Sequence, residues 1–162
     1  MRAALNTLIL MMLISFRVSA QIPAQTVPEF TFYRFNNTMF TSKDLPKSKM
    51  LFFLFFDCDC EHCQRAMENI GRNYQSFKNL TVCLISTDNQ SKIIHFADKY
   101  GRQLKGQMNV ILLQDRGNQF IEKFSPRRYP SMFLYSSEKK LIDYEDNEES
   151  VFRFLKLIKE SH

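Results

Sequence analysis

The chain has 162 residues, of which 44% are hydrophobic and 24% charged, and a formal net charge of +5. This length suits one domain with a single core. The charge is too mild and too interspersed to indicate nucleic-acid binding. With 4 Cys, 4 Gly and 5 Pro, the composition also disfavours a loop-rich scaffold held by many disulfides.

The first twenty residues have the pattern of a secretory signal peptide. A positively charged start is followed by an apolar core over residues 8–16 and by a small-residue cleavage pattern over residues 18–20. The apolar core is interrupted by Arg17 and is well under the roughly 20 residues needed to span a bilayer. We therefore predict cleavage after Ala20, export, and one mature domain over residues 21–162 with a net charge of about +3.

The hydrophobic pattern after this segment predicts a sheet covered by helices. Residues 30–35 and 39–45 form a predicted hairpin around the turn at Asn36-Asn37. Residues 50–56 are continuously apolar, as expected of a strand buried on both faces. Further strands are predicted at 80–86, 108–113, 132–135 and 141–144, and helices at 61–77, 91–100, 118–124 and 148–158. This order predicts an α/β fold with a central mixed sheet.

Cys60 and Cys63 form a Cys-x-x-Cys pair at the junction between the buried strand and the helix that follows it. A helix N-terminus has unpaired N–H groups and the positive end of the helix dipole, so it stabilises a thiolate. Three of the four cysteines lie within six residues, where they cannot join distant parts of a fold. The pattern favours thiol–disulfide exchange or metal chemistry over a structural role.

The apolar strand, the acidic turn, the Cys60–Cys63 motif and the later segment 128–133 entering a strand together resemble the thioredoxin-like superfamily. The nearest subgroup is the TlpA/ResA type, which is related to the redoxin group. The resemblance extends from about Pro28 to the end of the chain. It implies a three-layer sandwich in which helices flank a central mixed sheet, with an N-terminal β-hairpin extension.

The resemblance also implies roles for particular residues. Cys60 matches the exposed nucleophile, Cys63 the buried resolving thiol, and Pro130 a cis-proline that faces the pair. Tyr129 and His62 are the implied substrate-binding residues, with Tyr129 docking a partner strand by edge pairing. The implied activity is exchange of disulfides with protein partners, with no cofactor other than the Cys60–Cys63 disulfide.

The direction of electron flow depends on the neighbours of the pair. Asp57, Asp59 and Glu61 disfavour a thiolate, whereas a protonated His62 favours one. Strongly oxidising relatives have a proline where this chain has Glu61, so we expect a reductant. The implied setting is the periplasm of a Gram-negative bacterium, or otherwise the exterior of the cell after secretion, with a monomer that does not insert stably in the membrane. The implied electron donor is an upstream protein such as a membrane redox protein.

Three departures from the family pattern leave a redox-inactive binding module as an open alternative. The chain has no Trp, and Asp59 takes the place of the usual Trp before the first cysteine. Leu54 corresponds to the buried acid that relays protons in thioredoxins, so Asp57, Asp59 or water must accept the proton instead. Cys58 is an additional thiol, interpreted as an alternate resolving thiol or as a partly exposed cysteine with no role.

A second alternative is Sco-like copper binding. Cys58, Cys60 and Cys63 offer soft thiolate ligands, and His62 an imidazole ligand, for Cu(I), zinc or another soft metal. Sco-type proteins add a distant histidine, for which His95 and His162 are the candidates, but they space their cysteines by three residues. The main interpretation therefore involves no metal.

The remaining reactive residues favour simpler interpretations. Cys83 lies in an apolar run and is expected to be a buried core residue. Arg127 and Arg128 precede Tyr129 and are expected either to border a substrate groove or to be solvated. A peroxidase is disfavoured because the Pro and Thr that peroxiredoxins place before their nucleophile are missing.

Overall fold

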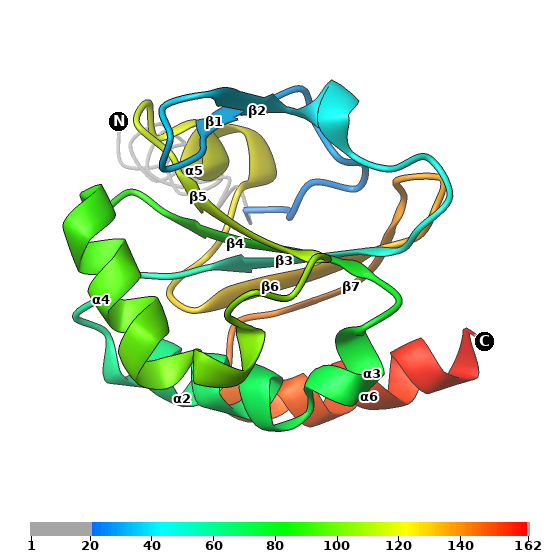
Figure 1. Cartoon of the computed structure of the whole chain (residues 1–162). Helices are drawn as coiled ribbons and strands as arrows, with labels where there is room; N and C mark the ends of the chain where they lie inside the picture. Colours follow the sequence, from blue (N-terminus) through cyan, green and yellow to red (C-terminus); the bar gives the residue numbers. More distant parts are fainter. Residues whose placement is uncertain (1–20, 162) are drawn as a thin grey trace, which may run out of the picture.

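The structure is a computed structural model that describes residues 21–161. The predicted signal peptide and His162 lie outside the described residues. Residues 21–161 contain a seven-stranded sheet in the order β2-β1-β5-β4-β3-β6-β7 (Figure 1). The strands are β1 (Thr31–Tyr33), β2 (Met39–Thr41), β3 (Leu51–Phe55), β4 (Thr81–Ser86), β5 (Val110–Gln114), β6 (Ser131–Tyr135) and β7 (Leu141–Glu145).

The sheet is mixed, as the sequence predicts. Strands β3, β4 and β5 are parallel to one another. Strand β6 is antiparallel to β3, and β7 is antiparallel to β6. The predicted hairpin is confirmed, because β1 and β2 pair antiparallel and β1 also pairs with β5. Asn37 in the hairpin turn has φ of +65°, a left-handed conformation that asparagine tolerates.

Helices cover both faces of the sheet (Figure 1). The helices α2, α3, α4 and α6 lie on one face, and α5 lies on the other with the hairpin. This arrangement confirms the expected thioredoxin-like sandwich. The α-helices are α2 (Glu61–Arg72), α3 (Tyr74–Phe77), α4 (Gln90–Tyr100), α5 (Gln119–Phe124) and α6 (Val151–Glu160), and the 3-10 turns are η1 (Ser42–Asp44), η2 (Arg102–Leu104) and η3 (Glu148–Ser150).

Strand β3 supplies side chains to two cores, because successive residues of a strand point to opposite faces. Phe52 and Leu54 pack under α2, α4 and α6. Phe53 joins an aromatic core under α5, where its ring centroid lies 5.4 Å from that of Phe124 and 5.8 Å from that of Tyr135. All five residues of β3 are buried, which confirms the prediction of a strand covered on both faces.

Two predicted helices differ from the structure. The helix predicted over residues 61–77 is wrong in its extent, because the chain breaks at Asn73 and continues as the short α3. The Asn73 amide Nδ2 donates to the Asn69 carbonyl at 2.8 Å, and this side-chain bond favours helix termination. The predicted terminal helix begins with the turn η3 and becomes α-helical only at Val151.

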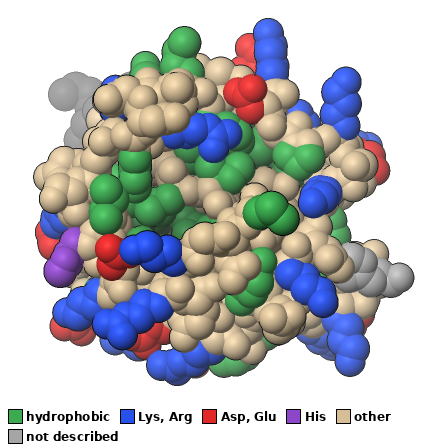
Figure 2. All heavy atoms as spheres, in the orientation of Figure 1, with side chains coloured by type: hydrophobic (Ala, Val, Ile, Leu, Met, Phe, Trp, Pro, Cys, Tyr) green, Lys and Arg blue, Asp and Glu red, His purple; other side chains and the backbone are tan. Residues whose placement is uncertain are grey.

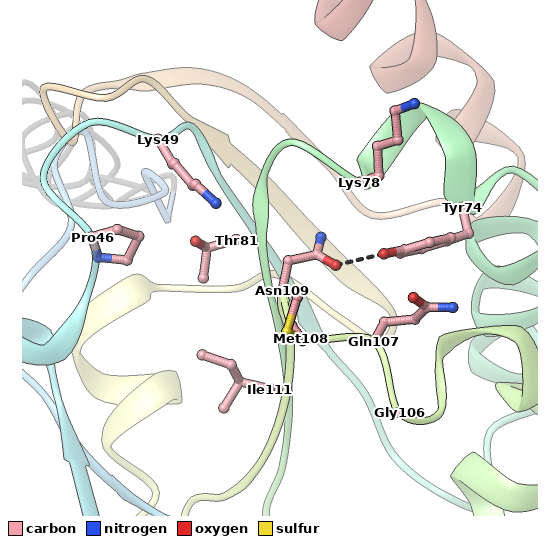
Figure 3. A pocket seen from close by; sticks show the side chains of 10 residues that line it. All are labelled: Pro46, Lys49, Tyr74, Lys78, Thr81, Gly106, Gln107, Met108, Asn109 and Ile111. Atoms are coloured by element: carbon pink, nitrogen blue, oxygen red, sulfur yellow. Dashed lines mark hydrogen bonds between the residues drawn. The ribbon is translucent and has the colours of Figure 1, made fainter.

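Two hollows lie away from the Cys-x-x-Cys motif. One hollow, of about 250 Å³, lies between α4 and β5. Figure 2 shows the hydrophobic side chains that gather there. A larger cavity of about 600 Å³ lies at the amino ends of β3, β4 and β5 (Figure 3). Tyr74 and Asn109 meet at its wall, where the Tyr74 hydroxyl donates to Asn109 Oδ1 at 2.7 Å. No helix within residues 21–161 is long and apolar enough to cross a membrane.

Candidate active site

The fold brings two loops together at the carboxyl ends of β3 and β4. These strands are parallel neighbours, so the loop of residues 56–60 after β3 and the segment 87–89 after β4 leave the sheet at the same edge. Ligands of open parallel sheets bind at such carboxyl ends. The Cys-x-x-Cys motif therefore lies where this architecture places functional groups.

Cys60 is the N-cap residue of α2. Its carbonyl accepts a hydrogen bond from the Gln64 N–H at 3.1 Å, and its own N–H donates to the Asp57 carbonyl at 3.3 Å. The Cys60 side chain is partly exposed and makes no capping hydrogen bond. The Cys60 sulfur is thus accessible at the positive end of a twelve-residue helix.

Cys63 lies in the first turn of α2 and is fully buried. Burial raises the pKa of the Cys63 thiol well above its usual value, and the nearby Cys60 thiol and Asp57 carboxylate add to the increase. A hydrogen bond from the Asp57 backbone opposes these effects without cancelling them. The four cysteines are free thiols, so the pair consists of one accessible thiol and one buried, protonated thiol.

Tyr129 and Pro130 come from the loop that enters β6. The peptide bond between them is cis, and Pro130 is buried. The Tyr129 ring packs against Phe55 with 4.9 Å between the ring centroids. Burial raises the pKa of the Tyr129 phenol, a hydrogen bond with Thr87 opposes the increase, and the negative charge of Asp57 adds to it. Tyr129 is partly buried and packs against the core cluster that contains Cys63.

His62 points toward the turn η3. Its Nδ1 atom lies 2.8 Å from Glu148 Oε1, and Arg65 Nε donates to the same oxygen at 2.9 Å. Partial burial works to raise the pKa of Glu148, but the hydrogen bonds from His62, the backbone and Arg65 lower it to about 2. A small hollow of about 140 Å³ lies between His62, Tyr129 and Glu148.

Arg128, which also lines this hollow, is paired within the chain. Its Nη2 atom lies 2.9 Å from Asp146 Oδ1. The Arg127 guanidinium stacks over the Tyr144 ring at 4.8 Å from its centroid. Arg128 borders the hollow, whereas Arg127 does not line it, and both side chains are exposed. Each arginine has a partner on β7 or the segment that follows it.

Cys58 is held by residues that follow β4. Its N–H donates to Asp88 Oδ2 at 2.9 Å. Burial first, and then hydrogen bonding to Asp88, raise the pKa of the Cys58 thiol to about 12. Cys58 is only 8% exposed, so the expectation of a partly exposed cysteine is wrong. At neutral pH Cys58 is a buried thiol with low nucleophilicity.

The other sequence predictions have mixed outcomes. Leu54 is fully buried in β3, so an apolar side chain occupies the predicted position of the proton-relaying acid. Cys83 is fully buried in the second core, as expected. His95 is exposed on α4. Within residues 21–161, no group of three or more His, Cys, Asp or Glu side chains is placed to hold a metal.

Sequence reasoning missed Asp88, Lys92 and Glu148. Lys92 Nζ donates to Asp88 Oδ1 at 3.0 Å and also binds the carboxylate of Asp59. The i,i+4 spacing of Asp88 and Lys92 at a predicted helix start was a visible signal. By contrast, Glu148 and His62 are 86 residues apart, and their contact has no local sequence signal.

These features define the class of thioredoxin-like oxidoreductases. Residues 23–144 match the model of the AhpC/TSA family, so the chain belongs to that family. None of the curated proteins compared matches the chain.

Solved structures with low sequence identity share the fold. Peroxidoxin BcpB from Mycobacterium tuberculosis has 15% identity and a TM-score of 0.71, with 88% of this chain and 99% of that chain covered. The thioredoxin domain of a thiol-disulfide oxidoreductase from Bacteroides vulgatus has 20% identity and a TM-score of 0.64, with 84% and 99% covered. A secreted disulfide oxidoreductase of M. tuberculosis has 15% identity and a TM-score of 0.63, with 79% and 95% covered.

Proposed function

We propose that this chain is an exported thiol–disulfide oxidoreductase that exchanges disulfides with protein partners through Cys60 and Cys63. The observation that carries the proposal is the asymmetry of the pair. Cys60 is partly exposed at the N-cap of α2, whereas Cys63 is fully buried in the first turn of that helix. An accessible thiol can attack the disulfide of a partner protein. A buried thiol is shielded from the partner and can resolve the mixed disulfide after it has formed.

The proposed reaction moves two electrons from the pair to the partner. The Cys60 thiolate attacks one sulfur of the partner disulfide, forms a mixed disulfide and releases the other partner sulfur as a thiolate. The Cys63 thiol then gives its proton to Asp57 or to water and attacks the Cys60 sulfur. This second step releases the second partner thiolate and leaves an oxidised Cys60–Cys63 disulfide. An upstream electron donor, such as a membrane redox protein, reduces that disulfide again.

The acidic surroundings of Cys60 support a role as reductant. Asp57, Asp59 and Glu61 all lie within three residues of Cys60. Nearby carboxylates disfavour the thiolate, and destabilising the reduced form lowers the reduction potential. The proposed setting is the periplasm of a Gram-negative bacterium, where the mature chain acts as a monomer that does not insert stably in the membrane.

The surroundings of Tyr129 support a docking position for the partner. Tyr129 packs against the core cluster that contains Cys63 at the entry to β6, and it lines the hollow of about 140 Å³. We propose that the partner strand pairs with the backbone at Tyr129. His62 borders the hollow and contacts a side chain of the partner there.

Trapping of the mixed disulfide tests this function. The variant Cys63→Ser is incubated with a peptide that contains a disulfide, and the product is digested and analysed by mass spectrometry. The expected product is a stable mixed disulfide at Cys60, because the resolving thiol is absent. The matched control, Cys60→Ser, should give no mixed disulfide. A folded Cys63→Ser variant that forms no adduct would indicate a binding module without redox chemistry, and a bound copper ion that blocks the reaction would indicate metal delivery.

A further inference from the structure

Lys92 connects α4 to the loop that precedes Cys60. Its ammonium group binds the carboxylate of Asp59, the residue immediately before Cys60, and lies 3.0 Å from Asp88 Oδ1. The hydrogen bonds to Asp59 and then to Asp88 raise the pKa of Lys92 above its usual value. Lys92 is therefore protonated at neutral pH. A permanent positive charge is therefore held against the reactive loop.

Asp88 extends this contact to the backbone of the loop. Its Oδ2 atom accepts the Cys58 N–H at 2.9 Å and the Ser86 hydroxyl at 3.2 Å, while its carbonyl accepts from Gln114 Nε2 at 2.9 Å. Its side chain is only 18% exposed. The Asp88 carboxylate is thus fixed by the sheet, and it in turn fixes both the loop and Lys92.

The charge balance around the loop depends on Lys92. Asp59, Asp88 and Lys92 together carry one net negative charge, and loss of the ammonium group would leave two. Among residues 21–161, Lys92 is the one cation that forms an ion pair with residues 57–60. The other charged or titratable groups around the loop come from the loop itself, α2 and the β6 entry: Asp57, Cys58, Glu61, His62, Cys63, Arg65, which pairs with Glu61, and Tyr129.

We propose that Lys92 is a positioning residue that offsets the carboxylates of Asp59 and Asp88 and thereby sets the reactivity and reduction potential of the Cys60–Cys63 pair. The proposal rests on the redox function proposed above. The hydrogen bonds of the Lys92 ammonium group go to Asp59 and Asp88, not to the Cys60 sulfur. It acts by adding positive charge beside a helix N-terminus, where both the helix dipole and the ammonium group favour a thiolate.

The test compares Lys92→Gln with the wild-type mature chain. Alkylation of Cys60 by iodoacetamide is followed at several pH values by peptide mass spectrometry, and the equilibrium with glutathione is measured. We expect alkylation of Lys92→Gln to be about fivefold slower at neutral pH. We also expect a roughly fivefold shift of the exchange equilibrium toward the disulfide, which corresponds to a potential lower by about 20 mV.

Three further variants separate the charge from a structural effect. Lys92→Arg keeps the positive charge, so its alkylation rate and its equilibrium with glutathione should remain within about twofold of the wild-type values. The double variant Lys92→Gln/Asp59→Asn restores one net negative charge. Its alkylation rate and its equilibrium with glutathione should return to within about twofold of the wild-type values. Lys99→Gln, on the same helix, should change nothing. Circular dichroism and thermal unfolding verify that each variant is folded.

Two negative results have different meanings. If wild-type Cys60 and Cys63 form no reversible couple with glutathione, the proposed function fails and the role of Lys92 fails with it. If the wild type exchanges normally while folded Lys92→Gln behaves like Lys99→Gln, only the role of Lys92 is overturned. If the alkylation rate of the double variant does not return toward the wild-type value, Lys92 does not act through its charge, and the proposed role is likewise overturned.

Discussion

The two ends of the parallel strands β3 and β4 present different surfaces. At the carboxyl ends, the hollow beside Tyr129 measures only about 140 Å³ and is lined by the carboxylates of Asp146 and Glu148, and the Cys60–Cys63 pair lies at the start of α2 at the same end of the sheet. At the amino ends, the cavity measures about 600 Å³ and is lined by Lys49, Lys78 and uncharged residues (Figure 3).

In this protein the reactive side chains do not lie at the largest cavity. The carboxyl end combines the start of α2 with a buried partner thiol, and both features change how readily a sulfur reacts. The described residues that line the larger cavity include no thiol or carboxylate. Variants at the two ends should therefore differ in their effect on the rate of disulfide exchange.

The largest effect is expected at Cys60. Cys60→Ser removes the attacking sulfur and should lower the rate of exchange with a disulfide peptide at least about a hundredfold. The matched variant Cys58→Ser removes a buried thiol two residues away and should remain within about threefold of the wild type. If Cys58→Ser is as inactive as Cys60→Ser, the division of roles between these cysteines is wrong.

A smaller effect is expected at Asp57. Its carboxylate lies close enough to Cys63 to raise the pKa of that thiol, and we expect it to accept the Cys63 proton. Asp57→Asn should lengthen the lifetime of the mixed disulfide about tenfold near neutral pH, as measured by rapid acid quenching. Asp98→Asn, an exposed change on α4, is the control. An unchanged lifetime in Asp57→Asn would make water the acceptor.

The His62–Glu148 contact predicts a pH effect on stability. Because the pKa of Glu148 is lowered from 4.5 to about 2, its contribution to the free energy of unfolding is present above pH 4.5. The contribution should decline as the pH falls toward 2. Glu148→Gln should lower stability at pH 7 by about 1–3 kcal/mol and flatten the profile between pH 5 and pH 2, as measured by urea unfolding. Parallel profiles for the two proteins would contradict this role.

The smallest effect is expected at the amino ends of the strands. Lys49→Gln and Lys78→Gln remove both lysines that line the large cavity and should leave the exchange rate within about twofold of the wild type. The same peptide assay measures this. A loss as large as that of Asp57→Asn would show that the cavity takes part in exchange.

Much of the fold could be predicted from local pattern. The continuous apolar runs of β3 and β4 identify buried strands, and the Cys-x-x-Cys position follows from the start of α2. The helix break at Asn73 was not predicted, because the helical spacing of apolar residues continues into α3. Hydrophobic periodicity reports which face is buried, but a side-chain hydrogen bond can end a helix without altering that periodicity.

The site was less predictable, because its contacts join distant parts of the chain. Lys92 and Asp59 are 33 residues apart, and His62 and Glu148 are 86 residues apart. The sequence shows that Asp59 and His62 flank the cysteines, but their partners depend on how α4 and η3 dock against the start of α2. The surroundings of Cys60 therefore required tertiary structure.

A redox titration of the mature protein tests the central claim most directly. The protein is equilibrated in defined thiol buffers, each cysteine is quantified by alkylation and peptide mass spectrometry, and bound metal is assayed in the same samples. We expect a reversible two-electron couple confined to Cys60 and Cys63, with a potential low enough for a reductant and with Cys58 and Cys83 reduced throughout. The absence of such a couple, with copper or zinc protecting Cys58, Cys60 and Cys63 from alkylation, would contradict it.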